Sequence, residues 1–255
     1  MFNLERPVLT NEEIIKYKNF EQNLVNIFGN GKVYGIDEVD VCNWAGNTAY
    51  CCVSIDNNKL YSKLIRDSKQ LTKEQINLAY KELVNDGKII DVGIGFATVN
   101  DYDTLGTRLA HEKGRRTAFQ NLRETPTVIL CDYYHIARVE GLQFATKRGD
   151  EKFRVVSAAS IIAKYIRNKI CEEIHKDFPE YKFSSNHGGF NKATKNLIIE
   201  NGFIPGWCRK GWCRKFTKGI KIRERVNEID YIKKVLVQEK FSEKNILQFS
   251  KNQKN

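Results

Sequence analysis

The apolar segment Val33-Tyr34-Gly35-Ile36 ends on two adjacent acidic residues, Asp37 and Glu38. A run of β-branched and aromatic residues is typical of a buried strand. Because successive side chains of a strand point to opposite faces, both acids can reach one ion only if the strand ends or twists there. Carboxylates at the edge of a packed sheet suit a divalent cation. A solvated acidic strand end is the commoner meaning of such a pair, so other parts of the chain must distinguish the two interpretations.

The rest of the chain predicts a sheet with helices around it. Strands are expected at 32–37, 48–55, 88–99, 127–132 and 141–147, and helices at 9–28, 67–84, 102–122, 157–178, 192–201 and 226–238. Early strands followed by alternating strands and helices indicate an α/β fold with a mixed sheet. We expect an N-terminal helix over 1–30, one catalytic domain over 31–218, and a basic helical tail over 219–255 that packs alongside or trails free.

Composition narrows the class of protein. Lys and Arg outnumber Asp and Glu by 11, which favours a polyanionic partner such as nucleic acid, although the Lys-, Asn- and Ile-rich usage explains the charge equally well. The seven cysteines are an odd number, which argues against a disulfide framework and predicts a reducing, cytoplasmic location. No apolar run reaches the roughly 20 residues of a membrane helix, and the N-terminus has no apolar signal segment. We therefore expect no membrane partner.

Two further patterns support a metal site. The predicted strand that ends at Cys131 is followed by Asp132, and two strands with carboxylates at one sheet edge would bind Mg²⁺ or Mn²⁺. In the expected helix at 157–178, four polar residues form one stripe at helical spacing: Ser157, Ser160, Lys164 and Asn168. The stripe is either a solvated face or the face turned toward the metal.

Several motifs, in this order, resemble those of ribonuclease HII between about residues 32 and 216. They are Gly35-Ile36-Asp37-Glu38, Asp67-Ser68-Lys69-Gln70-Leu71, Cys131-Asp132, Lys147-Arg148-Gly149-Asp150, Ala158-Ala159-Ser160-Ile161-Ile162-Ala163-Lys164, Pro179-Glu180-Tyr181 and His187-Gly188-Gly189-Phe190. The resemblance implies a ribonuclease H-like fold and endonucleolytic cleavage of the RNA strand in RNA–DNA hybrids. It also implies Mg²⁺ or Mn²⁺, two ions of which would activate a water and stabilise the departing oxygen.

The resemblance also implies the site residues. Asp37, Glu38 and Asp132 match three of the four metal-binding carboxylates of that family. The fourth, expected in an Arg-Asp pair after the Ala-Lys motif, reads Arg167-Asn168 here, so Asn168 is expected in a weakened catalytic position, with Glu172 one turn on as a partial substitute. The hybrid would be bound by a monomer. Its expected contacts are Lys69, Lys164, Phe190 and Arg214.

Other departures leave the activity open. Where ribonuclease HII has Gly-Arg-Gly, this chain has Asp40-Val41-Cys42, which removes the close backbone approach that glycine permits. The region around Gly149 and Lys164 looks closer to ribonuclease HII than to ribonuclease HIII. The alternatives are a nuclease with a shifted substrate and an impaired protein that binds hybrids without cutting them.

A tandem pentapeptide, Gly-Trp-Cys-Arg-Lys at 206–210 and 211–215, is either a nucleic-acid contact or a duplicated surface loop. Cys208 and Cys213 lack a second pair of ligands, so we interpret them as ordinary thiols and not as zinc ligands.

Overall fold

The computed structural model describes residues 9–247, which form one five-stranded mixed sheet with helices on both faces. The strands are β1 (Val33–Val39), β2 (Thr48–Ile55), β3 (Ile89–Ala97), β4 (Val128–Asp132) and β5 (Leu142–Thr146). Their order across the sheet is β3-β2-β1-β4-β5, with β2 antiparallel to β1 and β3, and β4 parallel to β1 and β5. All five predicted strands and the α/β fold class are confirmed.

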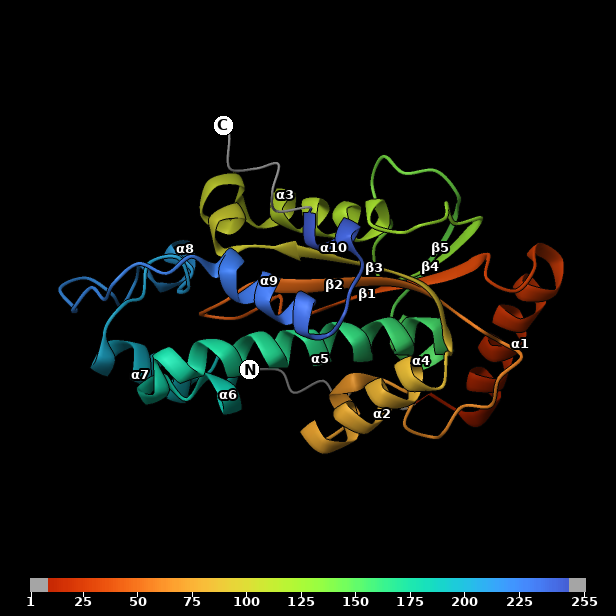
Figure 1. The fold of residues 1–255 in the computed structure, drawn as a ribbon, viewed down its shortest axis with the longest axis horizontal. Coiled ribbons are helices and arrows are strands. Elements are labelled where there is room, and N and C mark those ends of the chain that lie inside the picture. Colours follow the sequence, from red (N-terminus) through yellow and green to blue (C-terminus); the bar gives the residue numbers. More distant parts are fainter. Residues whose placement is uncertain (1–8, 248–255) are drawn as a thin grey trace.

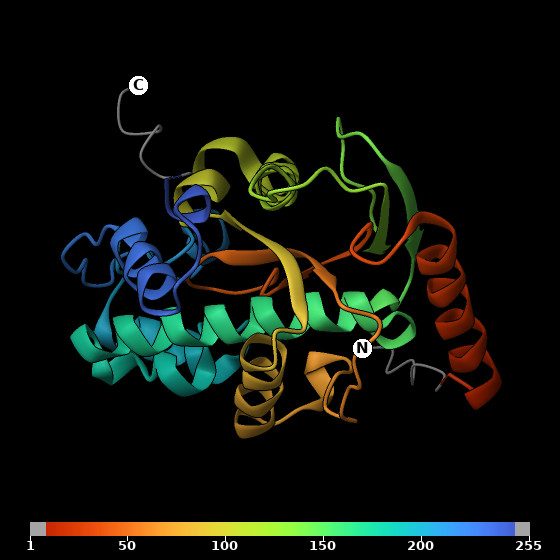
Figure 2. The same ribbon diagram turned by 45° about the vertical axis from the view of Figure 1, so that its right-hand side comes forward.

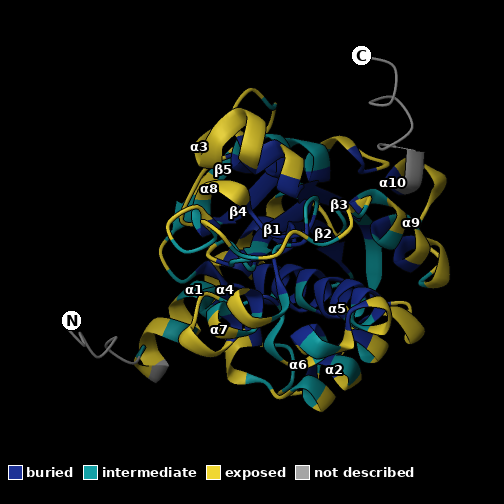
Figure 3. Cartoon of the chain, turned by 90° about the vertical axis from the view of Figure 1, so that its left-hand side faces the viewer, coloured by how far each residue is buried: buried dark blue, intermediate teal, exposed yellow. Residues whose placement is uncertain are grey.

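Two long helices enclose the sheet, α3 (Val99–Gln120) on one face and α5 (Arg154–Asp177) on the other (Figure 1). Glycines in the strands allow this close approach: a Cβ on Gly35 would lie 2.5 Å from the backbone of Val155 in α5, and one on Gly95 would lie 2.2 Å from that of Gly114 in α3. Strands β1 to β4 and the inner faces of both helices are mostly buried (Figure 3), whereas β5 is partly exposed. The start of α5 therefore lies directly on β1.

The remaining helices include those expected and several short ones that were not. They are α1 (Asn11–Phe28), α2 (Lys73–Asn85), α4 (Gly149–Lys152), α6 (Phe183–Asn186), α7 (Lys192–Asn201), α8 (Lys210–Cys213), α9 (Glu228–Gln238) and α10 (Glu243–Leu247), with 3₁₀ turns at Ser68–Gln70 and Pro179–Tyr181. Helix α3 is interrupted at Gly106, whose φ of 75° is not helical.

Helix α1 stands at one end of the sheet, beside the start of α5 (Figure 2). Phe153, the residue before α5, supplies no side-chain cap. Instead the buried carboxylate of Glu21 in α1 accepts hydrogen bonds from the backbone N–H groups of Arg154 (2.7 Å) and Val155 (3.2 Å). A negative charge on these unpaired donors stabilises the helix terminus. Helix α1 thus fixes where α5 begins.

The C-terminal segment packs on the core as far as it is described. Helix α9 buries Ile232, Val235 and Leu236, and the side chain of Asn245 accepts a hydrogen bond from the Ile94 N–H of β3 at 2.6 Å. Residues 219–247 therefore do not trail free, and 248–255 lie outside the described residues. Within 9–247, no helix has the length and apolar character needed to cross a membrane.

Candidate metal centre and nucleic-acid interface

Asp37 and Asp132 lie side by side at one edge of the sheet. Strands β1 and β4 are parallel neighbours in which Ile36 pairs with Cys131, so the next residue of each strand is an acid at the same level. Ile36 packs among residues of α3, whereas Val39 packs in the core under α5, which places the Asp37 side chain on the α5 side. It is 2% exposed. The expectation that two strands deliver carboxylates to one edge is confirmed.

Glu38 points to the opposite face, as the alternation of a strand requires. There Arg115 of α3 binds its carboxylate with two hydrogen bonds, Nη2 to Oε1 at 2.9 Å and Nε to Oε2 at 3.3 Å. Burial raises the pKa of Glu38, and the Arg115 guanidinium opposes that rise. Strand β1 continues to Val39, so Glu38 reaches the metal side of the sheet edge only by leaving this ion pair.

A fourth carboxylate, Asp150, joins the site from the short helix α4. The backbone N–H of Gly149 donates to Asp132 Oδ1 at 2.8 Å, which holds α4 against the end of β4. The Asp150 carboxylate accepts from Lys69 Nζ at 2.7 Å, and its backbone carbonyl accepts from Ser157 of α5 at 2.7 Å. Asp150 ends the Lys147–Asp150 motif, and the sequence alone predicts no role for it. The available signal was an acid placed directly before the helix that carries the polar stripe.

The electrostatics of the cluster favour a bound cation. Burial raises the pKa of Asp37 well above its usual range, and the charges of Asp150, Glu38 and Asp132 raise it further. Burial and the neighbouring Asp150 likewise raise the pKa of Asp67 to about 6. These shifts mean that the carboxylates repel one another when ionised.

The donor set also fits a hard divalent ion. The buried Oδ2 of Asp37 accepts no hydrogen bond from any described residue. Among the described acids, oxygens of Asp67, Asp150 and Glu151 lie within 4.8 Å of one another, a set that shares Asp150 with the sheet-edge carboxylates. Carboxylate oxygens with unused acceptor capacity are the ligands that Mg²⁺ and Mn²⁺ take in proteins, so the residues present fit the expected ions.

The polar stripe of α5 faces this site along most of its length. Ser157 binds Asp150, Ser160 shares a 2.8 Å hydrogen bond with Ser68, and Lys164 donates to Asp40 at 3.1 Å. The interpretation of the stripe as a solvated face is therefore wrong for these three residues.

Asn168 lies apart from the carboxylates. It is two turns beyond Ser160, about 12 Å along the helix axis, and its buried Oδ1 accepts no hydrogen bond within the described chain. Its predicted place beside the metal has no support in the geometry. Glu172 is bound by Lys73 at 2.8 Å and Lys169 at 2.9 Å, so it is not positioned to substitute. The additional carboxylate that the structure holds beside Asp132 is Asp150.

Of the two remaining expected substrate contacts, Phe190 belongs to an aromatic group. Its ring is 55% exposed, stacks on Trp44 with centroids 4.0 Å apart, and meets the edge of Trp212. The other residue, Arg214, is exposed just after α8. Both side chains are accessible to a ligand.

The two copies of the pentapeptide differ in their surroundings. In the first, Trp207, Cys208 and Arg209 are fully buried. Arg209 donates to the carbonyls of Gly46 (2.7 Å), Val41 (2.5 Å) and Asp40 (3.0 Å), and so holds the 40–47 loop beside the site. The first copy is therefore structural, and the duplicated-loop and nucleic-acid interpretations apply only to the second.

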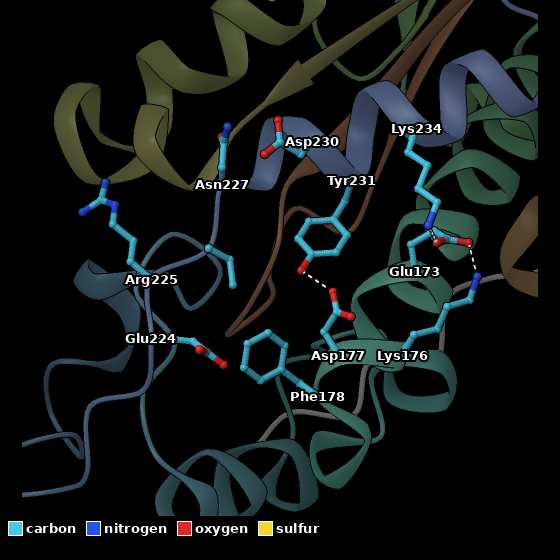
Figure 4. A pocket seen from close by; sticks show the side chains of 11 residues that line it. Glu173, Lys176, Asp177, Phe178, Glu224, Arg225, Asn227, Asp230, Tyr231 and Lys234 are labelled. Atoms are coloured by element: carbon cyan, nitrogen blue, oxygen red, sulfur yellow. Dashed lines mark hydrogen bonds and ion pairs between the residues drawn. The ribbon is translucent and has the colours of Figure 1, made fainter.

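A separate hollow of 620 Å³ lies between the end of α5 and the start of α9 (Figure 4). Tyr231 donates to Asp177 there, and Glu173 is paired with both Lys176 and Lys234. None of the expected site residues lines it, so we do not assign it to the carboxylate chemistry.

A mixed sheet with carboxylates gathered at the ends of its two central parallel strands defines a ribonuclease H-like protein. The family model described as Ribonuclease HII matches residues 34–218. This chain belongs to the ribonuclease HII family.

Individual relatives agree with this assignment. The chain is 34% identical over 174 residues to Ribonuclease HII of Macrococcus caseolyticus, covering 68% of this chain and 64% of that protein. It is 32% identical over 176 residues to Ribonuclease HII of Thermotoga petrophila, covering 69% and 71%. Ribonuclease H2 from Pyrococcus horikoshii OT3 has the same fold, with a TM-score of 0.61 and 24% identity over 73% of this chain and 97% of that one. Bst-RNase HIII, solved in complex with Mn²⁺, has a TM-score of 0.55 and 15% identity, covering 86% and 73%.

Proposed function

We propose that this protein is a metal-dependent endonuclease that hydrolyses the RNA strand of RNA–DNA hybrids. The observation that carries the proposal is the gathering of Asp37, Asp132 and Asp150 at one edge of the sheet, with Glu38 next to Asp37 on the opposite face, in a chain of the ribonuclease HII family. Because Asp150 supplies a fourth carboxylate, Asn168 does not by itself argue for an inactive protein.

In this proposal Asp37, Asp132 and Asp150 hold Mg²⁺ or Mn²⁺, and Glu38 joins them when Arg115 releases it. The bound ions would supply Lewis acidity for activating a water and stabilising a departing oxygen. The protein's part is to fix the ligands on two strands and on α4. Lys69 partly neutralises these carboxylates through its contact with Asp150, and its exposed side chain would contact a substrate phosphate next to them.

Substrate binding would fall to exposed or half-exposed groups around the carboxylates. Lys69, Lys164, Phe190 and Arg214 stay our candidates, and the net charge of +11 supports a polyanionic partner. We also propose that the protein acts as a monomer in the cytoplasm. The seven cysteines, all free, support a reducing location.

The alternative is an impaired protein that binds hybrids without cutting them. The feature that favours it is the 40–42 segment, where Asp40 forms an ion pair with Lys164 and so occupies a candidate substrate contact. A third possibility is an active nuclease with a shifted substrate. It would cleave long hybrids and leave a single ribonucleotide embedded in DNA intact.

Cleavage of end-labelled substrates in Mg²⁺ and in Mn²⁺ tests the proposal. The substrates are a long hybrid, a DNA duplex with one ribonucleotide, and all-DNA and all-RNA duplexes. We expect cleavage of the hybrid by the wild type and none by Asp37→Asn. Binding of the hybrid without cleavage in either metal would refute the enzyme and favour the impaired protein.

A further inference from the structure

We infer that the Asp40 carboxylate is a built-in competitor for nucleic acid: it occupies the position on Lys164 that a backbone phosphate of the substrate would take. The inference rests on the proposed function, because it concerns the same interface. Asp40 would then limit the affinity of the protein for nucleic acid. Removing its carboxylate should strengthen that binding.

The geometry places one anion between two cations. Asp40 Oδ1 accepts from Lys164 Nζ at 3.1 Å, and Oδ2 lies 3.6 Å from Arg167 Nε. Both cations come from consecutive turns of α5. Lysine and arginine side chains are the groups by which proteins commonly bind phosphate oxygens. Here the chain supplies the oxyanion from its own loop.

The two cations are not equally accessible. The Arg167 side chain is fully buried and is also held by the carbonyls of Asn47 and Ala45. The Lys164 side chain is 24% exposed, and that of Asp40 is 13% exposed. A phosphate arriving from solvent can therefore contact Lys164, whereas Arg167 mainly fixes Asp40 in place.

Lys164 also lies on the substrate side of α5. It continues the stripe of Ser157 and Ser160, which reach Asp150 and Ser68 beside the carboxylate cluster. Its partner Asp40 follows Asp37 by three residues. A nucleic-acid strand placed with a phosphate at the cluster would run past Lys164.

The Asp40 carboxylate is held in position by its backbone. Its φ of 64° is left-handed, a conformation that few residues other than Gly, Asn and Asp adopt. Its carbonyl accepts from Thr48 Oγ1 (3.2 Å) and Arg209 Nη2 (3.0 Å). The loop around Asp40 cannot move away from α5 without breaking these hydrogen bonds. A phosphate therefore binds Lys164 only by competing with a carboxylate that is held in place.

The test is the affinity for a fluorescent RNA–DNA hybrid, measured by anisotropy without divalent cations over a range of NaCl concentrations. Asp40→Asn is the isosteric neutral variant, and Asn tolerates the same backbone conformation. Asp40→Gly removes the side chain and relieves the backbone. We expect both to bind about five- to tenfold more tightly near 0.1 M salt, and to steepen the salt dependence by about one counterion.

Lys164→Gln, alone and combined with Asp40→Asn, separates competition from a general charge effect. If Asp40 acts by occupying Lys164, the gain disappears in the Lys164→Gln background. A gain that persists there would overturn the inference. So would unchanged or weaker binding by both Asp40 variants while their thermal unfolding shows them folded.

Failure of the proposed function gives a different pattern. If the wild type and all variants fail to bind the hybrid even at low salt, the proposed substrate is wrong. If the wild type binds and the Asp40 variants gain nothing, only the role of Asp40 is wrong. Binding with the expected gain, but without cleavage in Mg²⁺ or Mn²⁺, would support the role of Asp40 in a protein that does not cut.

Discussion

At the scale of single residues, individual carboxylates determine the charge at this edge of the sheet. Burial raises the pKa of Asp37, Asp132 and Asp67, and the charge of Asp150 raises all three further, so Asp150 contributes repulsion besides its proposed role as a ligand. We expect Asp150→Asn to reduce hybrid cleavage by at least about a hundredfold, because a metal ligand is lost. In the absence of metal, the variant should be as stable to heat as the wild type, or more stable. Single-turnover cleavage and thermal unfolding measure the two effects.

The variant Asn168→Asp is the matched control for Asp150→Asn. It would bury a carboxylate where the Asn168 oxygen already lacks a donor among the described residues, so it should destabilise the fold by about 1–3 kcal/mol. It should not raise cleavage, since position 168 lies away from the cluster. A rise in activity in this variant, with Asp150→Asn still active, would return position 168 to the metal site and remove Asp150 from it.

Glu228 gives a separate prediction on pH. Burial raises its pKa to about 7, opposed mainly by the Val99 N–H that donates to it at 2.7 Å. The folded state thus holds this proton more tightly than the unfolded chain, whose ordinary value is 4.5. The resulting stability is fully present below about pH 4.5 and is lost as the pH rises through 7.

The variant Glu228→Gln should not lose stability as the pH rises, because Gln carries no charge and still offers an acceptor to the Val99 N–H. We expect the variant to gain stability over the wild type between pH 5 and 8, by up to about 3 kcal/mol. Urea unfolding across this range measures the difference. A constant difference between the two proteins at every pH would show that Glu228 does not titrate there.

Among the helices, α1 stabilises the N-terminus of α5. Glu21 caps the first N–H groups of α5, and that helix carries Ser157, Ser160 and Lys164 into the site. Glu21→Ala should cost about 1–2 kcal/mol of unfolding free energy, the usual loss for a helix cap. Glu21→Gln keeps an acceptor and should cost less. Equal losses in both variants, measured by chemical denaturation, would mean that the packing of α1 matters and the cap does not.

Sequence patterns were informative where an element is long and one of its faces is buried. Strands β1 and β4 and helix α5 follow from apolar periodicity, which the fold enforces by burying those faces. Asp150 was missed because α4 has only four residues and no periodicity, and because its position depends on Gly149 meeting the end of β4. The two identical pentapeptides show why a sequence pattern alone cannot predict burial. Arg209 is buried by tertiary contacts, whereas the equivalent Arg214 is exposed.

At the scale of the whole molecule, a strongly basic chain gathers several buried carboxylates at one place. The net charge is +11, yet the centre of the sheet edge holds several buried carboxylates with few compensating cations, chiefly Lys69 and Arg115. Such an arrangement favours a polyanion at the surface and a divalent cation at the carboxylates. Metal binding should therefore contribute to the stability of the whole domain, and should depend on pH.

We expect Mn²⁺ or Mg²⁺ to raise the melting temperature, and to do so more at pH 8 than at pH 5. The raised pKa values of Asp37, Glu38 and Asp67 mean that protons compete with the metal at low pH, so ion binding must displace them. An ion at a hundred times its dissociation constant adds about 2.7 kcal/mol, or roughly 5–10 °C for a chain of this size. Thermal unfolding with and without metal measures the shift, and Asp37→Asn should reduce it at both pH values. An equal shift at pH 5 and pH 8, or one that Asp37→Asn leaves intact, would place the stabilising ion outside the carboxylate cluster.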